Sequence, residues 1–232
     1  RSCHSIPDSV MLAITTTAGT ILHTGDFKID YTPIDGKPMD LGRIAELGNK
    51  GILALMSDST NSERKGFTMS EKSVGAVFDK LFMNCKKRIV VATFASNVHR
   101  VQQIVDSAVK YGRKIAVCGR SMINMIENAR ALGYINAPED IFIDIDLIRN
   151  YNDEQLVIIT TGSQGETMSA LTRMAAGEHK KVTITPNDLV IISANAIPGN
   201  EYLDMLAKKS KNWYYLWQDH NTSYQFTVSI DN

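Results

Sequence analysis

The chain has 232 residues and equal numbers of basic and acidic side chains, 25 of each, so its formal net charge is zero. This balance excludes the overall positive charge that would indicate nucleic-acid binding, but it does not exclude a local basic groove. No apolar run reaches the roughly 18 residues of a membrane helix, and the three widely spaced cysteines predict neither a disulfide framework nor a zinc ribbon. We therefore expect a globular cytoplasmic protein with no membrane contact.

The first sixty residues predict short strands separated by polar turns. Residues 10–17 and 20–23 are rich in β-branched side chains and flank Gly19, which predicts a hairpin. A short helix over residues 41–47 and a buried strand over residues 51–56 are expected to follow.

Two carboxylates follow strands of this first part. Asp26 comes after the second strand of the hairpin, and Asp58 comes directly after the expected strand at 51–56. A side chain at a strand end is held by a rigid element yet exposed, which suits a metal ligand or a general base. For Asp26, an ordinary turn aspartate is an interpretation that is at least as common.

From residue 70 onward the pattern changes to strands that alternate with helices. The expected helices cover residues 70–82, about 97–111, 120–132 and 168–176, and the expected strands cover residues 88–94, 114–118, 141–143, 156–159 and 189–193. This alternation predicts a parallel α/β sheet, whose ligands gather at the carboxyl ends of the strands. The polar residues expected at or just beyond such ends are Asp58, Ser96, His99, Arg120, Ser163 and Gln164.

Residues 160–166, with the sequence Thr-Thr-Gly-Ser-Gln-Gly-Glu, connect an apolar strand to a helix. Such a turn directs backbone N–H groups and small hydroxyls to one place, where the N-terminus of a helix favours an anion such as phosphate. An ordinary glycine-containing β–α loop is the alternative, because such turns are common in α/β domains.

Residues 201–232 differ in composition from the rest. They hold both tryptophans but no glycine or proline, and no alternation of helix and strand continues there. We expect this segment to be an atypical tail of foreign or frame-shifted origin.

Six stretches of the sequence, in the same order along the chain, resemble the ribonuclease J family. They are residues 4–9 (His-Ser-Ile-Pro-Asp-Ser), 24–27 (Thr-Gly-Asp-Phe), 57–61 (Ser-Asp-Ser-Thr-Asn), 92–100 (Ala-Thr-Phe-Ala-Ser-Asn-Val-His-Arg), 162–166 (Gly-Ser-Gln-Gly-Glu) and 197–200 (Ile-Pro-Gly-Asn). The resemblance implies an α/β fold with part of a metallo-β-lactamase αββα domain over residues 1–66. A parallel-sheet β-CASP domain would cover residues 67–200.

The same resemblance implies a metal-dependent ribonuclease that is both a 5′-to-3′ exonuclease and an endonuclease in RNA processing and decay. Its substrate would be 5′-monophosphorylated single-stranded RNA, its cofactors two zinc or manganese ions, and the full-length protein could form a homo-oligomer. His4 and Asp26 would be metal ligands, with Asp26 bridging the two ions, and Asp58 would act beside them. Imidazole and carboxylate groups suit both metals.

The resemblance also implies two RNA-binding loops. Ser96, His99 and Arg100 would belong to the RNA channel. The phosphate path would be lined by Gly162, Ser163, Gln164, Gly165 and Glu166. Without the resemblance, His4 reads as a surface-loop histidine and His99 as an exposed helix residue.

One departure from the family concerns the metal ligands. The His-x-His-x-Asp-His cluster that supplies most of them in ribonuclease J does not occur in this sequence. We therefore expect an incomplete and inactive piece of the enzyme, and the alternative is a non-catalytic RNA-binding fragment or a degenerate relative. Another hydrolase of the metallo-β-lactamase fold is disfavoured, because the stretches at 96–100 and 162–166 resemble the β-CASP domain.

Overall fold

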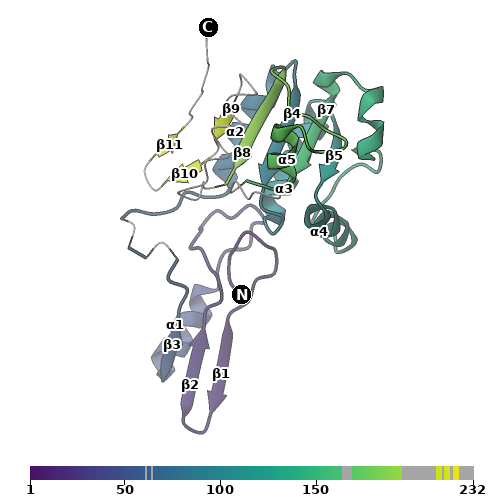
Figure 1. The fold of residues 1–232 in the computed structure, drawn as a ribbon. Helices are drawn as coiled ribbons and strands as arrows, with labels where there is room; N and C mark the ends of the chain where they lie inside the picture. Colours follow the sequence, from purple (N-terminus) through teal and green to yellow (C-terminus); the bar gives the residue numbers. More distant parts are fainter. Residues whose placement is uncertain are drawn as a thin grey trace.

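The computed structural model describes residues 1–60, 62–63, 65–163 and 169–194, together with the backbone of residues 213–215, 217–219 and 222–224. The described chain forms two parts (Figure 1). We call residues 1–60 the N-terminal lobe, and we call the part built around the larger sheet, from residue 70 onward, the sheet lobe. The long axis of the N-terminal lobe points away from the larger sheet (Figure 1).

The N-terminal lobe is built on a three-stranded sheet. Strands β1 (Leu12–Thr16) and β2 (Gly19–His23) form the predicted antiparallel hairpin, and β3 (Ala54–Met56) lies parallel to β2. Gly19 opens β2 with a φ of +141°, a backbone conformation that glycine adopts more readily than other residues. Helix α1 (Leu41–Lys50) lies beside this sheet and begins at Asp40, whose side chain accepts the N–H of Arg43.

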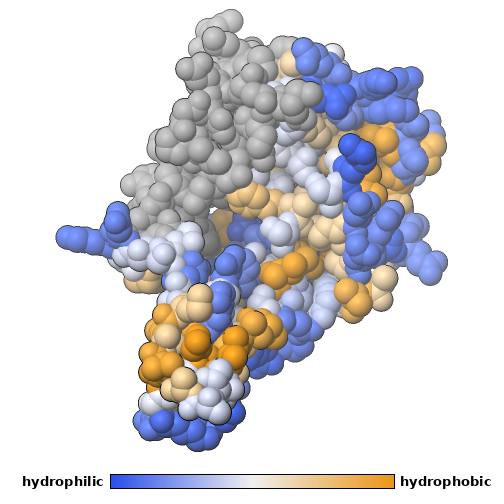
Figure 2. Space-filling view, turned by 60° about the horizontal axis from the view of Figure 1, so that its bottom comes forward, coloured by the Kyte–Doolittle hydropathy of each residue, from blue (hydrophilic) through white to orange (hydrophobic). Residues whose placement is uncertain are grey.

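The prediction that residues 51–56 form a buried strand is wrong about burial. The side chains of Leu53, Leu55 and Met56 are 62%, 61% and 54% exposed. Helix α1 contributes no buried residue, so no described layer covers this sheet as helices cover the larger one. Apolar side chains accordingly gather on the surface of the N-terminal lobe (Figure 2).

The sheet lobe contains a six-stranded parallel sheet in the order β6-β5-β7-β4-β8-β9, which confirms the predicted parallel α/β architecture. Its strands are β4 (Arg88–Thr93), β5 (Lys114–Cys118), β6 (Phe142–Ile143), β7 (Leu156–Thr160), β8 (Asp188–Ser193) and β9 (Trp213–Tyr215). Every residue of β7 and β8 is buried, as expected of strands covered on both faces.

Helices cover both faces of this sheet. They are α2 (Lys72–Met83), α3 (Val98–Lys110), α4 (Arg120–Ala131) and α5 (Ala170–Ala176), with two 3-10 turns at Ile145–Asn150 and Asp153–Gln155. One core cluster joins α2, α3 and α4 to the sheet through residues such as Phe78, Ile104 and Met122. The second cluster lies on the other face, where α5 packs Leu171 and Met174. None of the helices in the described ranges is both long and apolar enough to cross a membrane.

Beyond residue 200, where the sequence shows no alternation of helix and strand, the structure describes three short strands. Strand β9 pairs parallel with β8, with Val190 opposite Trp213, and so extends the sheet by one strand. Strands β10 (Trp217–Asp219) and β11 (Thr222–Tyr224) form an antiparallel hairpin. The aromatic residues there have high β-propensity, which favours strands. The domain boundaries at 66 and 200 stay predictions.

Candidate functional site

A cleft of about 870 Å³ lies where the two lobes meet. Its walls come from residues 1–8, 26–37, 58–60 and 66–71 and from the start of α3, and not every residue in these ranges contributes. The cleft brings together four of the predicted site residues from four separate segments. They are His4, Asp26, Asp58 and His99.

The segment that carries His4 is fixed to the loop that carries Asp26. The Ser2 hydroxyl donates to the carbonyl of Asp26 at 3.2 Å, and the N–H of Lys28 donates to the carbonyl of Cys3 at 2.8 Å. The imidazole Nδ1 of His4 lies 3.3 Å from the Ser5 hydroxyl. Backbone contacts on either side of His4 and Asp26 therefore hold these two side chains in the same wall of the cleft.

Asp26 and Asp58 lie close because β2 and β3 are parallel neighbours that end at the same edge. The hydroxyl of Thr24, just after β2, accepts the N–H of Asp58 at 3.0 Å. The Asp58 carboxylate accepts the N–H of Thr60 at 2.8 Å. Hydrogen bonds from the N–H and hydroxyl of Thr60 are the main cause that lowers the pKa of Asp58, with smaller contributions from the N–H of Phe27 and the charge of His4. The carboxylate is thus held in its ionised form.

His99 lies in the first turn of α3, where the Asn97 side chain caps the helix by accepting the N–H of Arg100 at 3.0 Å. The N–H of His99 donates to the carbonyl of Ser5 at 3.4 Å, so α3 touches the N-terminal segment directly. Burial lowers the pKa of His99 below its usual value, while nearby acidic side chains oppose this shift. His99 is therefore a neutral imidazole at pH 7, able to donate and to accept.

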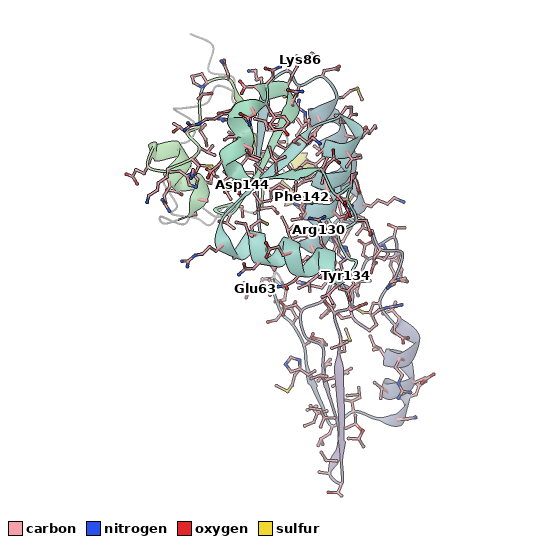
Figure 3. The ribbon with its side chains drawn as sticks, turned by 90° about the vertical axis from the view of Figure 1, so that its right-hand side faces the viewer. Glu63, Lys86, Arg130, Tyr134, Phe142 and Asp144 are labelled. Atoms are coloured by element: carbon pink, nitrogen blue, oxygen red, sulfur yellow. The ribbon has the colours of Figure 1, made fainter. Side chains whose placement is uncertain are left out.

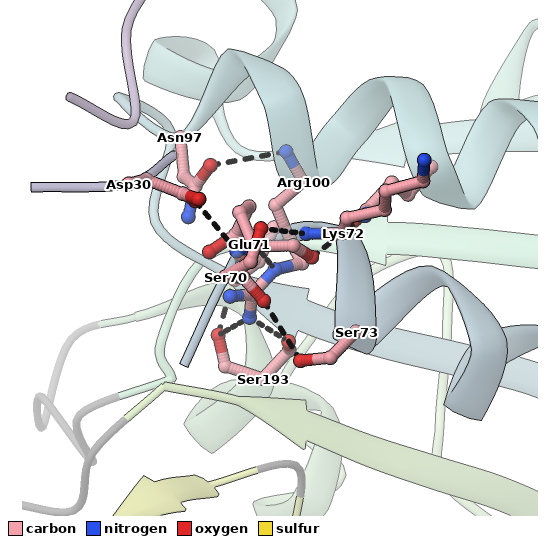
Figure 4. Close-up of polar contacts among 10 residues, drawn as sticks. Asp30, Ser70, Glu71, Lys72, Ser73, Asn97, Arg100 and Ser193 are labelled. Atoms are coloured by element: carbon pink, nitrogen blue, oxygen red, sulfur yellow. Dashed lines mark hydrogen bonds and ion pairs between the residues drawn. The ribbon is translucent and has the colours of Figure 1, made fainter. Parts of the chain in front are cut away.

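Arg100 follows His99 in the chain but is directed into the interior rather than into the cleft. Its Nε donates to the carboxylate of Glu71, and its Nη1 donates to the hydroxyl of Ser193 and, at 3.3 Å, to the carbonyl of Ser193 (Figure 4). Arg100 is only 7% exposed. Arg100 does not line the cleft, because the carboxylate of Glu71, one residue before α2, holds its guanidinium in the interior. Its predicted place in an RNA channel stays a prediction.

A second set of contacts that the sequence did not indicate joins the lobes at the start of α2. The N–H of Glu71 donates to Asp30 Oδ2 at 3.3 Å (Figure 4). The Ser70 hydroxyl donates to the carbonyl of Thr32 at 3.0 Å. Burial alone would raise the pKa of Asp30, but hydrogen bonds from Thr32 and Ser70 and the charge of Lys28 lower it overall. The helix start at Ser70 was visible in the sequence, whereas its partners 38 to 41 residues away were not.

A third contact closes the junction on the side of α4. The hydroxyl of Tyr134, just after α4, donates to the carboxylate of Asp8 in the N-terminal segment. Tyr134 lies at the junction of the two lobes (Figure 3). Lys37 also reaches Asp8, with its Nζ 4.0 Å from Oδ1. The cleft is thus bounded by contacts between the lobes on more than one side.

Of the predicted glycine turn, the structure describes residues 160–163 at and after the end of β7, and α5 begins after Ser169, its N-terminal cap. Gly162 has a φ of +103°, and a Cβ added there would lie 2.2 Å from the Ser169 hydroxyl oxygen. Ser163 is only 1% exposed. Ser96 follows the neighbouring parallel strand β4, and neither Ser96 nor Ser163 lines the cleft. The predicted site residues that lie outside the described part are Gln164, Gly165 and Glu166.

The donors in the cleft do not amount to a complete metal site. Within the described ranges, no three His, Cys, Asp or Glu side chains converge on one point where a metal ion could be held. His4, Asp26 and Asp58 are chemically suitable ligands, but a single catalytic zinc ordinarily takes three protein ligands. The described residues therefore do not fit a pair of ions by themselves.

Comparison with known proteins identifies relatives over most of the chain. The sequence profile described as "Ribonuclease J, beta-CASP domain" matches residues 86–205, which are 120 of the 232 residues. The protein named Ribonuclease J from Helicobacter pylori is 54% identical over 217 residues, which cover 91% of this chain and 32% of that protein. Ribonuclease J from Synechocystis is 52% identical over 86% of this chain and 31% of its own length. Ribonuclease J2 from Bacillus subtilis is 45% identical over 90% of this chain and 38% of its own length.

The chain thus spans about a third of the length of the curated relatives it matches. Among solved structures, a protein of unknown function from Enterococcus faecalis V583 has a similar fold, with a TM-score of 0.58 at 16% identity. The similarity covers 93% of this chain and 50% of that one. At this identity it supports the arrangement of the elements and nothing about activity.

Proposed function

The chain belongs to the ribonuclease J family, and on that basis we propose that it carries the substrate cleft of a metal-dependent ribonuclease. The observation that carries this proposal is the convergence of His4, Asp26, Asp58 and His99 in one cleft between the lobes. These four residues come from segments far apart in the sequence. They combine ionisable carboxylates with imidazoles, which are the groups that phosphodiester hydrolysis uses as metal ligands and proton carriers.

The proposed substrate is 5′-monophosphorylated single-stranded RNA, cleaved from its 5′ end and internally in cytoplasmic RNA processing and decay. Phosphate contacts and base stacking, which are tolerant of sequence, would then dominate recognition. Formation of a homo-oligomer by the complete enzyme belongs to the same proposal.

Two zinc or manganese ions are proposed as cofactors, with His4 and Asp26 among their ligands. Such ions, when bound, lower the pKa of a water molecule and stabilise the leaving oxygen. Because the described donors are too few for a pair of ions, the remaining ligands would have to come from outside the described residues. The contribution of this chain's own residues is then to keep Asp58 ionised through Thr60 and to present the neutral imidazole of His99 to the substrate.

The first test measures binding and cleavage separately with the 232-residue chain. We expect fluorescence anisotropy with a labelled, 5′-monophosphorylated RNA to show weak binding. We expect denaturing gels to show no cleavage, even with added manganese. Manganese-dependent turnover that Asp26→Ala abolishes would overturn the expected inactivity while supporting the ribonuclease assignment. Absence of RNA binding at low salt would contradict the assignment itself.

A second candidate function is a non-catalytic RNA-binding role, and the absence of three convergent metal donors among the described residues favours it. A chimaera distinguishes the ribonuclease function from the non-catalytic RNA-binding role. The matching region of the Helicobacter pylori relative is replaced by this chain, and cleavage of 5′-monophosphorylated RNA is measured. If the chain is catalytically competent, the chimaera cleaves RNA and Asp26→Ala lowers its rate by several orders of magnitude. An inactive chimaera that still binds RNA would support the non-catalytic role.

Within an active chimaera, Ser163→Ala serves as a milder variant in the predicted phosphate loop. Loss of one hydrogen bond to a charged group would raise the activation free energy by about 1.5–3 kcal/mol. An effect as large as that of Asp26→Ala would contradict the separate roles given to the two residues.

A further inference from the structure

The charged side chains that line the cleft are mostly acidic. The acidic ones are Asp8, Asp26, Asp30, Asp35, Asp58 and Glu71, and the lysines and arginines are Arg1, Lys28 and Lys37. Carboxylates at this density repel a phosphate chain at close range. RNA can therefore approach Asp26 and Asp58 only where local positive charge offsets that repulsion.

Two of these three basic side chains, Lys37 and Arg1, already have partners within the protein. Lys37 lies 4.0 Å from a carboxylate oxygen of Asp8, and Arg1 donates to the carbonyl of Pro38 at 3.3 Å. Across residues 1–60, 62–63, 65–163 and 169–194, the ammonium of Lys28 forms neither an ion pair within 4.0 Å nor a side-chain hydrogen bond. Lys28 is therefore the cation of the cleft wall that is available to a ligand.

The backbone at Lys28 is fixed. Its N–H donates to the carbonyl of Cys3 at 2.8 Å, and it follows Asp26 by two positions. Burial lowers the pKa of Lys28, and the charges of Glu71 and Asp30 oppose that shift. Both carboxylates also have other partners, because Glu71 is paired with Arg100 and Asp30 accepts two backbone N–H groups. A half-buried ammonium in such a place is screened less by solvent than a surface lysine, which strengthens its attraction for a phosphate.

We propose that Lys28 binds a backbone phosphate of single-stranded RNA in the cleft and so positions the chain beside Asp26 and Asp58. This inference rests on the proposed function and names the residue that would hold the substrate there. The partner chemistry is a phosphodiester or a terminal 5′-phosphate, both of which a single ammonium can bind as a point charge.

The test measures how RNA affinity depends on salt. Each phosphate neutralised on a single strand contributes about 0.7 to the slope of log K against log salt concentration. We expect Lys28→Gln to lower the magnitude of this slope by about 0.7. When salt rises from 50 to 200 mM, the variant should then lose about 2.6-fold less RNA affinity than the unaltered chain. Lys28→Arg should restore the slope, because it restores the charge. Lys50→Gln removes the same charge at the exposed end of α1, outside the cleft, and should leave the slope unchanged.

The outcomes separate this inference from the proposed function. If the unaltered chain binds RNA and Lys28→Gln has the same salt slope as the unaltered chain, the role of Lys28 is contradicted but the proposed function is not. The same holds if Lys50→Gln lowers the salt slope as much as Lys28→Gln does. No binding by the unaltered chain contradicts both. Two RNAs of the same sequence, one with a 5′-phosphate and one with a 5′-hydroxyl, show whether Lys28 binds the terminal phosphate or a phosphodiester. A slope difference confined to the 5′-phosphate RNA assigns the terminal group, and a difference with both assigns a phosphodiester.

A footprint of the unaltered chain does not depend on how well any variant folds. Lysines are acetylated with and without RNA, and the sites are quantified by mass spectrometry. We expect RNA to slow acetylation of Lys28 and not that of Lys50. Equal acetylation of Lys28 in the presence of saturating RNA would overturn the inference.

Discussion

The guanidinium of Arg100 in α3 donates to the carboxylate of Glu71, one residue before α2, at the junction of the two lobes. Both side chains are largely buried, at 9% and 15% exposed. The same arginine reaches Ser193 at the end of β8, and the backbone of Glu71 reaches Asp30 in the N-terminal lobe. The two residues of this ion pair therefore connect the starts of α2 and α3, the large sheet and the N-terminal lobe, and Glu71 is also among the residues that line the cleft.

We expect removal of Arg100 to destabilise the fold strongly. Arg100→Met leaves Glu71 buried without its counter-charge, a change that typically costs about 3–5 kcal/mol. The free energy of unfolding in urea measures the effect. Arg43→Met is the control, since Arg43 pairs with Glu46 at 2.8 Å on an exposed face of α1 and should change stability by less than about 1 kcal/mol. Similar losses in both variants would show that burial of the Arg100 pair is unimportant.

The same pair predicts a dependence of stability on acid. Burial alone would raise the pKa of Glu71, but the charge and hydrogen bond of Arg100 outweigh burial and lower it below its usual value of 4.5. The stabilisation is therefore complete above pH 4.5 and is lost as the pH falls through the lowered pKa of the folded state. Urea midpoints of the natural chain and Glu71→Gln should differ most at neutral pH and converge in acid. A gap that is constant down to pH 3 would contradict this assignment.

His99 should titrate below pH 6.5, because burial disfavours its charged form. Asp35 opposes that shift, so Asp35→Asn should lower the pKa of His99 further. Proton NMR titration of the imidazole C–H signals measures both values, with His99→Gln used to assign the resonance. Asp140→Asn removes an exposed carboxylate that pairs with Lys114 and should leave the His99 titration unchanged. A rise of the His99 pKa in Asp35→Asn would contradict the placement of these two side chains.

Gly162→Ala should be more destabilising than an ordinary glycine substitution. Its φ of +103° is rarely adopted by other residues, and the new Cβ would lie 2.2 Å from Ser169 Oγ and 2.7 Å from Ser169 Cβ. Gly133→Ala is the matched control, because Gly133 has a φ of +76° with no heavy atom within 4 Å. The control isolates backbone strain, about 1–2 kcal/mol, and the excess cost in Gly162→Ala measures the clash. Equal thermal stabilities of the two variants would show that the turn can shift to accept a side chain.

The sequence predicted the elements of the sheet lobe well because local signals decide them. The buried parallel strands are continuous apolar runs, and the helices begin at recognisable caps such as Asn97. The sequence also placed Asp26 and Asp58 at strand ends, and the parallel pairing of β2 with β3 brings those ends to one edge.

Local sequence signals do not predict contacts between segments that are far apart in the chain. His99 and Arg100 are consecutive, and the sequence predicted the same role for both. His99 lines the cleft, however, whereas Arg100 is buried. Successive residues on a helix point about 100° apart, so which of the two enters the cleft depends on how α3 is rotated against its neighbours. Glu71 fixes that rotation from 29 residues away.

Local sequence was enough to predict most of the strands and helices, and the side chains with suitable chemistry that stand at their ends. Packing between distant segments leaves β3 exposed and pairs Arg100 with Glu71. It also brings Lys28 into the lining of the cleft between the lobes, where its ammonium has no ion pair within 4.0 Å among the described residues. The difference comes from the distance along the chain over which each interaction acts. Backbone preferences and hydrophobic periodicity act over a few residues, whereas burial and charge pairing depend on segments that meet only after the chain has folded.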